Sequence, residues 1–452
     1  MAAAWLVCVL VAALAAGCGS SGGGRGGGDG APAKPPRALT IYSDLPVVGP
    51  TGVTGAPQRA AQALSIENGA RLALEAWGHT VRYGHGGHRG SFHVYFKPMN
   101  DADAATGAWS QDLTAANAQL AASQPTTVAY IGDYDSAATA LSLPALSPNG
   151  ILQVSPWSPY IGFTDANPAD GKGDPARFYP QSGRNDFARL VPSDLGEAAA
   201  IVRYMSMLGV ARLYVLGDVS GFDAAIAQLV ANDAPAYGIT LVSLQEGLDT
   251  QTNTEPRGYA SIAAGVALQR PDAVLLGGTP GVGAIALWQE LHAKLPDAKL
   301  FAPSTLATPA FLAGIAAAGA SCSGPTGATV PCYPASGATY VTSPILEPRQ
   351  YPASAKVVFR AYRRRFKLTP TVYALYGYEA MNDVLKAIRL TGRFTTDRPR
   401  LLAVFFHHLG AIRGVIGDYT IDGNGDSSLR TFDGYRVSAA GALVFDREIR
   451  LP

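Results

Sequence analysis

The sequence predicts an α/β protein built from two doubly wound, mainly parallel-sheet lobes. Strand-like and helix-like segments alternate through most of the 452 residues, which is typical of repeated βα units. The strand-like runs are almost continuously apolar, as expected of parallel strands that are covered on both faces. The folded part is also longer than the roughly 250–300 residues at which a single core stops growing. Two lobes are therefore favoured over one sheet.

Hydrophobic periodicity assigns the segments in order along the chain. The predicted strands of the βα units cover residues 39–42, 92–96, 127–132, 212–216, 240–244, 272–276 and 299–301. The predicted helices cover residues 60–77, 107–122, 198–207, 224–232, 260–268, 284–294, 356–366 and 373–391. Three final strand-like runs, 418–422, 431–437 and 443–449, favour antiparallel hairpins around Asn424-Gly425 and Ala440-Gly441.

Residues 1–17 predict a cleaved secretory signal. Their apolar run is shorter than the ~20 residues that a membrane-spanning helix needs. The segment Ala15-Ala16-Gly17-Cys18 resembles the lipobox of bacterial lipoproteins, in which the cysteine is diacylated and becomes the mature N-terminus. It departs from that pattern because no Lys or Arg follows Met1 and because Leu14 lies one place early. Ordinary signal cleavage, which would leave Cys18 as a free thiol, is the alternative.

A flexible tether is expected over residues 18–37, because the segment after Cys18 is mostly Gly, Ser, Pro and Ala and cannot bury a core. The sequence thus predicts an exported domain that is lipid-anchored to the outer face of the cell membrane. The formal net charge of +1 gives no reason to expect nucleic acid or an anionic surface as a partner.

Two cysteines remain in the folded part, Cys322 and Cys332. In an oxidising compartment, a close pair within a Gly/Pro-rich loop predicts a local disulfide. A zinc site is the alternative, but no second cysteine pair or histidine lies nearby in the sequence to complete it.

Several segments together resemble the branched-chain amino-acid (leucine/isoleucine/valine-binding) family of solute-binding proteins, which has the type I periplasmic binding protein fold. The segments that carry the resemblance are Ile131–Thr139, Gly150–Pro156, Arg189–Asp194, Ala374–Ala380 and Asp422–Asp426. They are spread over almost the whole chain after the tether. The resemblance implies two lobes that are joined by a multi-strand hinge and close on a ligand.

The resemblance also implies how the chain divides and what it does. Residues 38–191 and 336–425 would form lobe 1, and residues 192–335 and 426–452 would form lobe 2. The protein would capture a small polar ligand, such as an amino acid or amide, and deliver it to the permease of an ABC-type importer without catalysing a reaction. A ligand-sensing lipoprotein of the same fold is one alternative. A hydrolase with Ser136 as nucleophile is another, although no base can be assigned to it.

Five residues are candidates for ligand contacts. Ser136 follows a predicted strand and precedes a helix, so its hydroxyl and the neighbouring amides can face an anionic group. The family uses the serine at this place for the ligand carboxylate, whereas a plain helix N-cap is the structural alternative. Trp157 and Ser158 fall where the family contacts the ligand, although Trp157 could equally be core. Thr279 and Ser304 occupy the corresponding places of the second lobe.

The family usually has an acid at the place of Ser304 for the ligand ammonium, and here that acid is absent. A buried ammonium without an anionic partner costs several kcal/mol, so a standard α-amino acid is disfavoured. The charge could come from elsewhere, and the candidates are Asp44, Asp133, Asp135 and Asp218. The loop 157–185 is long for a compact domain and could be functional.

No cofactor or metal is expected from the sequence. The segment Gly281–Ala286 resembles a dinucleotide fingerprint, but no acid ends the following predicted strand. The segment Asp422–Asp426 has the first spacings of a calcium loop, but Ser427 replaces the turn glycine that such loops need. A β-turn is the favoured interpretation there, because Asn-Gly is a strong turn signal.

Overall fold

The computed structural model describes residues 37–84, 89–166, 174–179, 185–219, 221–252, 254–317, 322–323, 329–330 and 334–452. The predicted signal and Cys18 lie outside the described residues, as does Cys332; of Cys322 only the backbone is described. The lipid anchor and the disulfide therefore stay predictions. Within the described ranges, no helix has the length and apolar character needed to cross a bilayer.

The first sheet has six strands in the order β2-β3-β1-β4-β5-β6. They are β1 (Arg37–Asp44), β2 (Thr80–Tyr83), β3 (Gly90–Met99), β4 (Thr127–Ile131), β5 (Leu152–Ser155) and β6 (Phe187–Arg189). Every pair is parallel except β2 with β3. The strand order reverses between β1 and β4, which is where ligands bind in open sheets of this kind.

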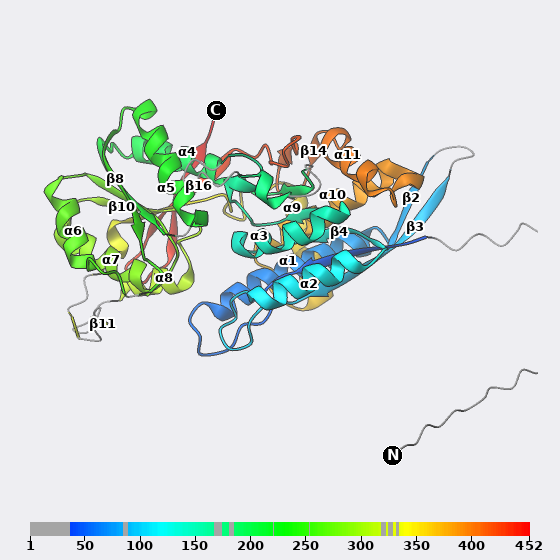
Figure 1. The fold of residues 1–452 in the computed structure, drawn as a ribbon, viewed down its shortest axis with the longest axis horizontal. Coiled ribbons are helices and arrows are strands. Elements are labelled where there is room, and N and C mark those ends of the chain that lie inside the picture. Colours follow the sequence, from blue (N-terminus) through cyan, green and yellow to red (C-terminus); the bar gives the residue numbers. More distant parts are fainter. Residues whose placement is uncertain are drawn as a thin grey trace, which may run out of the picture. The chain divides into compact units, whose positions relative to one another are not determined.

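Helices cover both faces of this sheet (Figure 1). One face packs against α1 (Ala56–Ala76), α9 (Ala353–Phe366), α10 (Tyr373–Thr391) and α11 (Arg398–His408). The other face packs against α2 (Gln111–Ser123) and α3 (Ser136–Leu146). Successive strand residues point to opposite faces, so Ile41 joins the first core while Tyr42 joins the second. The strands are almost continuously apolar because both of their faces are buried.

Two glycines allow α1 and α10 to cross in close contact. A Cβ atom on Gly69 would lie 2.1 Å from the carbonyl oxygen of Ala374, and one on Gly377 would lie 1.9 Å from that of Ile66. Both distances are far shorter than any real Cβ contact. The two main chains therefore approach to a distance that only glycine permits.

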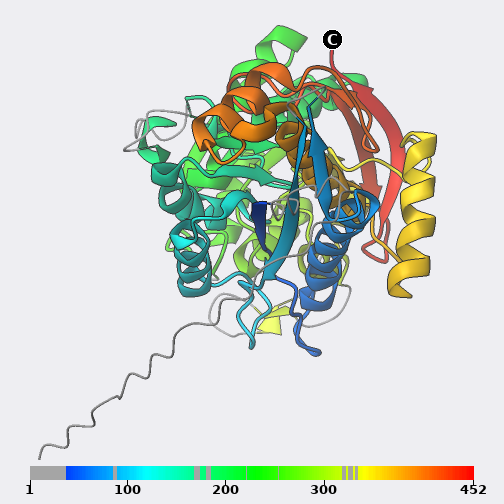
Figure 2. The same ribbon diagram turned by 90° about the vertical axis from the view of Figure 1, so that its right-hand side faces the viewer.

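The second sheet has seven strands in the order β17-β16-β13-β10-β9-β7-β8. They are β7 (Arg212–Asp218), β8 (Thr240–Leu248), β9 (Ala273–Gly277), β10 (Lys299–Ala302), β13 (Thr339–Ser343), β16 (Thr431–Val437) and β17 (Leu443–Arg450). The pairs from β8 to β13 are parallel, and β16 and β17 are antiparallel additions, drawn in red in Figure 2. The prediction of two doubly wound lobes is confirmed.

Helices also cover both faces of the second sheet. One face carries α4 (Asp194–Met207) and α5 (Gly221–Asp233). The other carries α6 (Tyr259–Leu268), α7 (Val282–Lys294) and α8 (Pro309–Ala316). Two small ribbons complete the described strands, one of β11 (Cys322–Ser323) with β12 (Thr329–Val330) and one of β14 (Ile412–Arg413) with β15 (Asp418–Tyr419).

Three chain segments connect the two sheets, after β6, after β13 and before β16. The first and third are hydrogen-bonded, since Arg189 N donates to the carbonyl oxygen of Gly425 at 2.9 Å. The second segment is hydrogen-bonded to β16, which follows the third, since Glu347 N donates to Asp433 Oδ2 at 2.8 Å. These segments form the multi-strand hinge. Residues 339–343, counted with lobe 1 in the predicted division, pair within the second sheet as β13.

The two predicted C-terminal hairpins have different outcomes. β16 and β17 pair antiparallel around Ala440-Gly441, so that hairpin is confirmed. The run 418–422 also turns back antiparallel around Asn424-Gly425, where Ile421 bridges Ser427 and Ser428 N donates to the Thr420 carbonyl oxygen at 3.0 Å. Its predicted pairing with the run 431–437 is wrong, because β15 pairs with β14. Asn424-Gly425 still forms a turn, in which Asp422 Oδ1 accepts the main-chain N–H groups of Asn424 and Asp426, each at 2.9 Å. The turn is thus stabilised by hydrogen bonds within itself, and it does not connect β15 to β16 as a hairpin.

Candidate ligand-binding site

Three aspartates lie close together at the carboxyl ends of strands of the first sheet, where the strand order reverses. Asp44 ends β1, Asp101 follows β3 and Asp133 follows β4. Each offers a carboxylate oxygen, and these oxygens lie within 4.8 Å of one another. All three side chains are fully buried. We call this group the acidic triad.

Neutral polar side chains surround the acidic triad. Asn117 Nδ2 donates to Asp44 Oδ1 at 2.9 Å, and the Tyr130 hydroxyl lies 3.2 Å from Asp44 Oδ2 and 2.9 Å from Asp133 Oδ1. The Ser142 hydroxyl donates to Asp133 Oδ2. These partners come from α2, β4 and α3, so the network joins the strand ends to both covering helices.

Burial has the largest effect on the acid strength of the triad. Desolvation, helped by the charge of Asp133, raises the pKa of Asp44 to about 9 and that of Asp101 to about 8. Desolvation raises the pKa of Asp133 to about 7, although the hydrogen bond from Ser142 opposes it. The protein thus disfavours three bare carboxylates at this place.

Ser136 is the first residue of α3, and the N-cap position is occupied by Asp135. The N-cap alternative for Ser136 is therefore wrong. Its oxygen instead accepts the main-chain N–H of Tyr160 at 3.4 Å. The Oδ2 atom of Asp135 is buried and has no hydrogen-bond partner among the described residues. An acid thus stands immediately before the serine that the resemblance assigns to a ligand carboxylate.

Trp157 and Ser158 both lie at the carboxyl end of β5, but they are enclosed to different degrees. The Trp157 ring is 5.3 Å from the Tyr373 ring, edge to face, and Tyr373 is 6.0 Å from the Tyr134 ring. Ser158 is fully buried, and its hydroxyl lies 2.7 Å from that of Thr139. The Ser158 side chain is therefore bonded within the lobe, while Trp157 borders an aromatic cluster.

Arg189, at the end of β6, holds the segment that contains Ser158. The side chain is fully buried, and its Nη1 donates to the carbonyl oxygens of Ser158 at 3.0 Å and Tyr160 at 2.7 Å. Its Nη2 donates to the Thr164 hydroxyl. Its Nε pairs with Asp426 Oδ1 at 2.6 Å. One guanidinium thus connects the candidate ligand segment to the hinge.

Thr279 follows β9 on the second sheet, next to the carboxylate that ends β7. Its main-chain N–H donates to Asp218 Oδ2 at 2.9 Å. The Thr250 hydroxyl donates to the same Asp218 oxygen and lies 3.0 Å from the Thr279 carbonyl oxygen. Asp218, one of the four suggested acids, is thereby placed beside a predicted ligand residue.

Ser304 follows β10 and contacts an acid that the sequence reasoning missed. Its N–H donates to Glu197 Oε1 at 2.6 Å, and its hydroxyl donates to Glu197 Oε2 at 2.7 Å. The Thr342 hydroxyl also donates to Glu197, at 2.9 Å. Desolvation of the buried carboxyl raises its pKa. The missing family acid thus has a counterpart from α4. Its only sequence signal was an acid immediately before a predicted helix.

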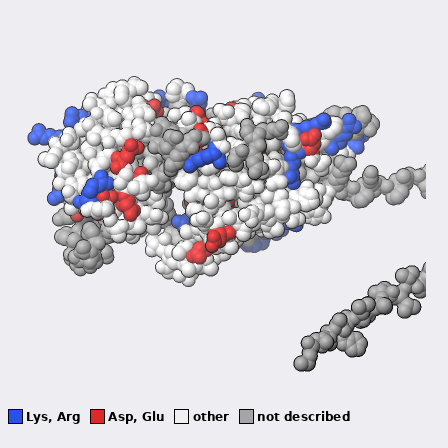
Figure 3. Space-filling model, in the orientation of Figure 1, with Lys and Arg blue, Asp and Glu red and all other residues white. Residues whose placement is uncertain are grey.

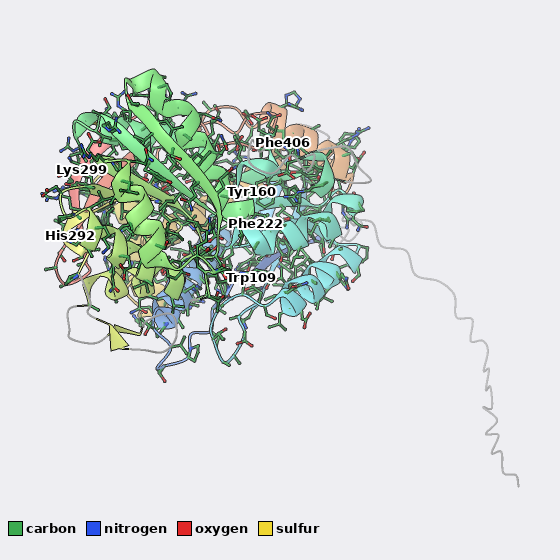
Figure 4. All side chains as sticks on the ribbon, turned by 60° about the vertical axis from the view of Figure 1, so that its left-hand side comes forward. Trp109, Tyr160, Phe222, His292, Lys299 and Phe406 are labelled. Atoms are coloured by element: carbon green, nitrogen blue, oxygen red, sulfur yellow. The ribbon has the colours of Figure 1, made fainter. Side chains whose placement is uncertain are left out.

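The five candidate ligand residues fall in two groups. Ser136, Trp157 and Ser158 belong to neighbouring loops of the first sheet, whereas Thr279 and Ser304 belong to the second. The Tyr160 ring approaches α5 of the second lobe, with its centroid 4.8 Å from that of Phe222; Figure 4 shows these two rings together. Both groups therefore lie at the carboxyl ends of their parallel strands, where doubly wound sheets bind ligands.

A groove of about 380 Å³ lies at the opposite, amino edge of the second sheet. Its polar lining includes His292, Lys299 and Tyr340, of which Figure 4 labels the first two. None of the five candidate ligand residues borders it. On the face shown in Figure 3, charged side chains form small separate groups rather than an extended basic surface.

Comparison with known proteins agrees with this architecture. The periplasmic binding protein family matches residues 101–442, which is more than half of the chain. Comparison with curated protein sequences found no significant match.

Solved structures of solute-binding proteins are similar over most of their length. An ABC transporter substrate-binding protein from Desulfitobacterium hafniense, in complex with Leu, is 17% identical with a TM-score of 0.63, covering 90% of this chain and 100% of the other. A leucine-binding protein from Thermotoga maritima is 18% identical with a TM-score of 0.61, covering 91% and 99%. A solute-binding protein from R. palustris, in complex with benzoate, is 14% identical with a TM-score of 0.59, covering 90% and 95%.

At these identities the solved structures establish the fold alone. The family match is the stronger finding. It covers strands β4, β5 and β6 of the first sheet, all five candidate ligand residues and the hinge. This chain belongs to the periplasmic binding protein family.

Proposed function

We propose that this protein captures a small polar ligand outside the cytoplasm and delivers it to an ABC-type importer. The ligand would be an amino acid, an amide or a related compound. Membership of a periplasmic binding protein family supports the location and the substrate-binding role. The observation that carries the proposal is the position of polar candidate residues at the carboxyl ends of both sheets, joined by a three-segment hinge.

Hinge closure would be the mechanism. Ser136 and the Trp157–Ser158 segment would contact the ligand from the first lobe, and Thr279 and Ser304 from the second. Contacts from both lobes exist together only in the closed state, so the ligand shifts the population toward closure. No covalent step is needed. The described hydrogen bond of Ser136 is to a main-chain amide, so it gives no support to the hydrolase alternative.

Two features bear on the ligand class. Structures with the same fold carry leucine in one case and benzoate in another, so the fold accepts both amino acids and aromatic acids. In this chain Glu197 lies against Ser304, which would suit a ligand ammonium or amide. The aromatic cluster beside Trp157 would suit an apolar part of the ligand.

A ligand screen tests the proposal. We expect one class among amino acids, amides, short peptides and aromatic acids to raise the melting temperature of the purified protein. Ser136→Ala should weaken that ligand roughly 10- to 100-fold, because a hydrogen bond to a charged group contributes about 1.5–3 kcal/mol. The measurement is isothermal titration calorimetry on both proteins.

Ser206→Ala is the matched control, since Ser206 is an exposed serine of α4 and does not follow the carboxyl end of a strand in either sheet. It should leave the affinity unchanged. If no compound in the broad screen raised the melting temperature, the binding role proposed here would be refuted. Permease and ATPase genes beside this one would favour import, while a neighbouring kinase gene would favour the sensing alternative.

The lipid anchor is tested separately, because Cys18 lies outside the described residues. We expect Cys18→Ala to release a folded, ligand-competent protein from the membrane, since the acylated cysteine would be lost while the domain after the tether is unchanged. Fractionation followed by immunoblotting measures the membrane-bound share. Continued membrane retention, or loss of folding, would contradict the anchor.

A further inference from the structure

The acidic triad has an unusual balance of charges. Asp44, Asp101 and Asp133 form no ion pair with any Lys, Arg or His of the described residues. Among the described residues, the side-chain groups that donate to the three carboxyls are neutral hydroxyls and amides. Buried charges are normally paired or bound to metals. Three fully buried carboxyls must therefore be neutralised, either by protons or by a bound cation.

A second observation concerns one oxygen of the triad. Asp101 is fully buried, and the Thr114 hydroxyl donates only to its Oδ2, at 3.2 Å. Its Oδ1 is buried and has no hydrogen-bond partner among the described residues. An oxygen that is buried without a partner destabilises the fold. It is thus available to a group that the triad would hold.

We infer that the acidic triad is a binding site for a divalent cation of the calcium class, separate from the site of the organic ligand. Hard cations of this kind prefer carboxylate and hydroxyl oxygens. The triad oxygens lie within 4.8 Å of one another, a separation that ligands about 2.4 Å from a calcium ion on either side can span. The Tyr130 hydroxyl, between Asp44 and Asp133, adds a neutral oxygen at the same place.

The position of the triad suggests what the cation would do. The side chain of Asp133 belongs to the triad. Its carbonyl oxygen lies 2.8 Å from the Ser155 hydroxyl and 3.3 Å from that of Ser158. Ser136 begins α3 three residues later in the chain. A cation would therefore fix the ends of β1, β3 and β4 beneath the candidate ligand segments. It would act as a brace and would make no contact with the organic ligand.

Metal content and thermal stability test this site on the full chain. The protein is stripped with EDTA, dialysed, and titrated with CaCl₂, MgCl₂ or MnCl₂ up to about 10 mM, ten times the weakest dissociation constants typical of extracellular calcium sites. We expect one bound cation per chain by elemental analysis, and a rise in melting temperature with cation concentration. Calcium should give the largest rise.

The decisive variant is Asp101→Asn, which keeps the shape of the side chain and removes one charge. It should weaken cation binding at least tenfold and abolish the rise in melting temperature. Without metal it should be at least as stable as the unchanged protein, because one of three crowded, buried carboxyls has gone. Asp112→Asn is the control, since Asp112 is exposed on the same helix as Thr114, and it should behave like the unchanged protein.

Two results would overturn the inference. If the unchanged protein retained no cation and showed no rise in melting temperature with any of the three salts, the triad would hold protons instead. If Asp101→Asn bound the cation as tightly as the unchanged protein, the cation would bind elsewhere. The first measurement uses only the unchanged protein, so it decides the matter even if the variant fails to fold. Neither result affects the ligand screen above.

Discussion

Arg189→Met should destabilise the protein by roughly 3–5 kcal/mol, because it removes a buried charged donor from its ion pair and leaves buried carbonyl and hydroxyl oxygens unpaired. The guanidinium is fully buried, and it supplies donors to two carbonyl oxygens, a hydroxyl and the Asp426 carboxylate. Methionine fills similar space but donates to none of them. Urea unfolding monitored by circular dichroism measures the change in free energy.

A local effect should accompany the loss of stability. The segment from Ser158 to Thr164 is attached to the hinge through Arg189. Its main-chain amides should therefore exchange hydrogen faster in the variant than in the unchanged protein, when both are fully folded in buffer without urea. Mass spectrometry of peptides from this segment detects that exchange. Because Ser158 is a candidate ligand residue, ligand affinity should fall as well.

Arg450→Met is the matched control for Arg189. Arg450 also forms an ion pair, with Glu448, but its side chain is 75% exposed. Exposed ion pairs contribute about 0–1 kcal/mol, so the control should change stability by less than about 1 kcal/mol. Equal effects of the two substitutions would show that the buried contacts of Arg189 contribute nothing special to stability.

Gly377→Ala should also cost stability, by about 1–3 kcal/mol or more, as expected when an extra carbon is forced into a packed site. The added Cβ would lie 1.9 Å from the carbonyl oxygen of Ile66. Backbone atoms cannot turn away as a side chain can, so α1 and α10 must move apart. Thermal unfolding followed by calorimetry measures the loss.

Gly265→Ala gives the matched control with the opposite sign. Gly265 lies inside α6, is exposed, and has no atom within 4 Å of the position a Cβ would take. Alanine in a free helical position is favoured over glycine by about 0.5–1 kcal/mol. The control should therefore raise stability. A neutral or stabilising Gly377→Ala would contradict the close crossing of α1 and α10.

The regular architecture was predictable because it depends on local patterns. Apolar strands that alternate with helices require parallel sheets covered on both faces, whatever the details of packing. The family resemblance added Ser136, Thr279 and Ser304 as candidates, and each of them follows a predicted strand. The turn at Asn424-Gly425 was also correctly expected. The pairing of the preceding run with residues 431–437 was not, because strand pairing depends on which distant segment reaches the edge, and β15 pairs with β14.

The sequence by itself determined the two-lobed fold class, the strand ends and the family to which the chain belongs. Only the tertiary structure decided which polar groups meet there. Glu197 reaches Ser304 from 107 positions away in the chain, and Asp44 joins Asp133 although two helices and three strands lie between them. Such contacts leave no periodic signal, because a buried acid is identified by its neighbours in space, and its position in the chain does not reveal them.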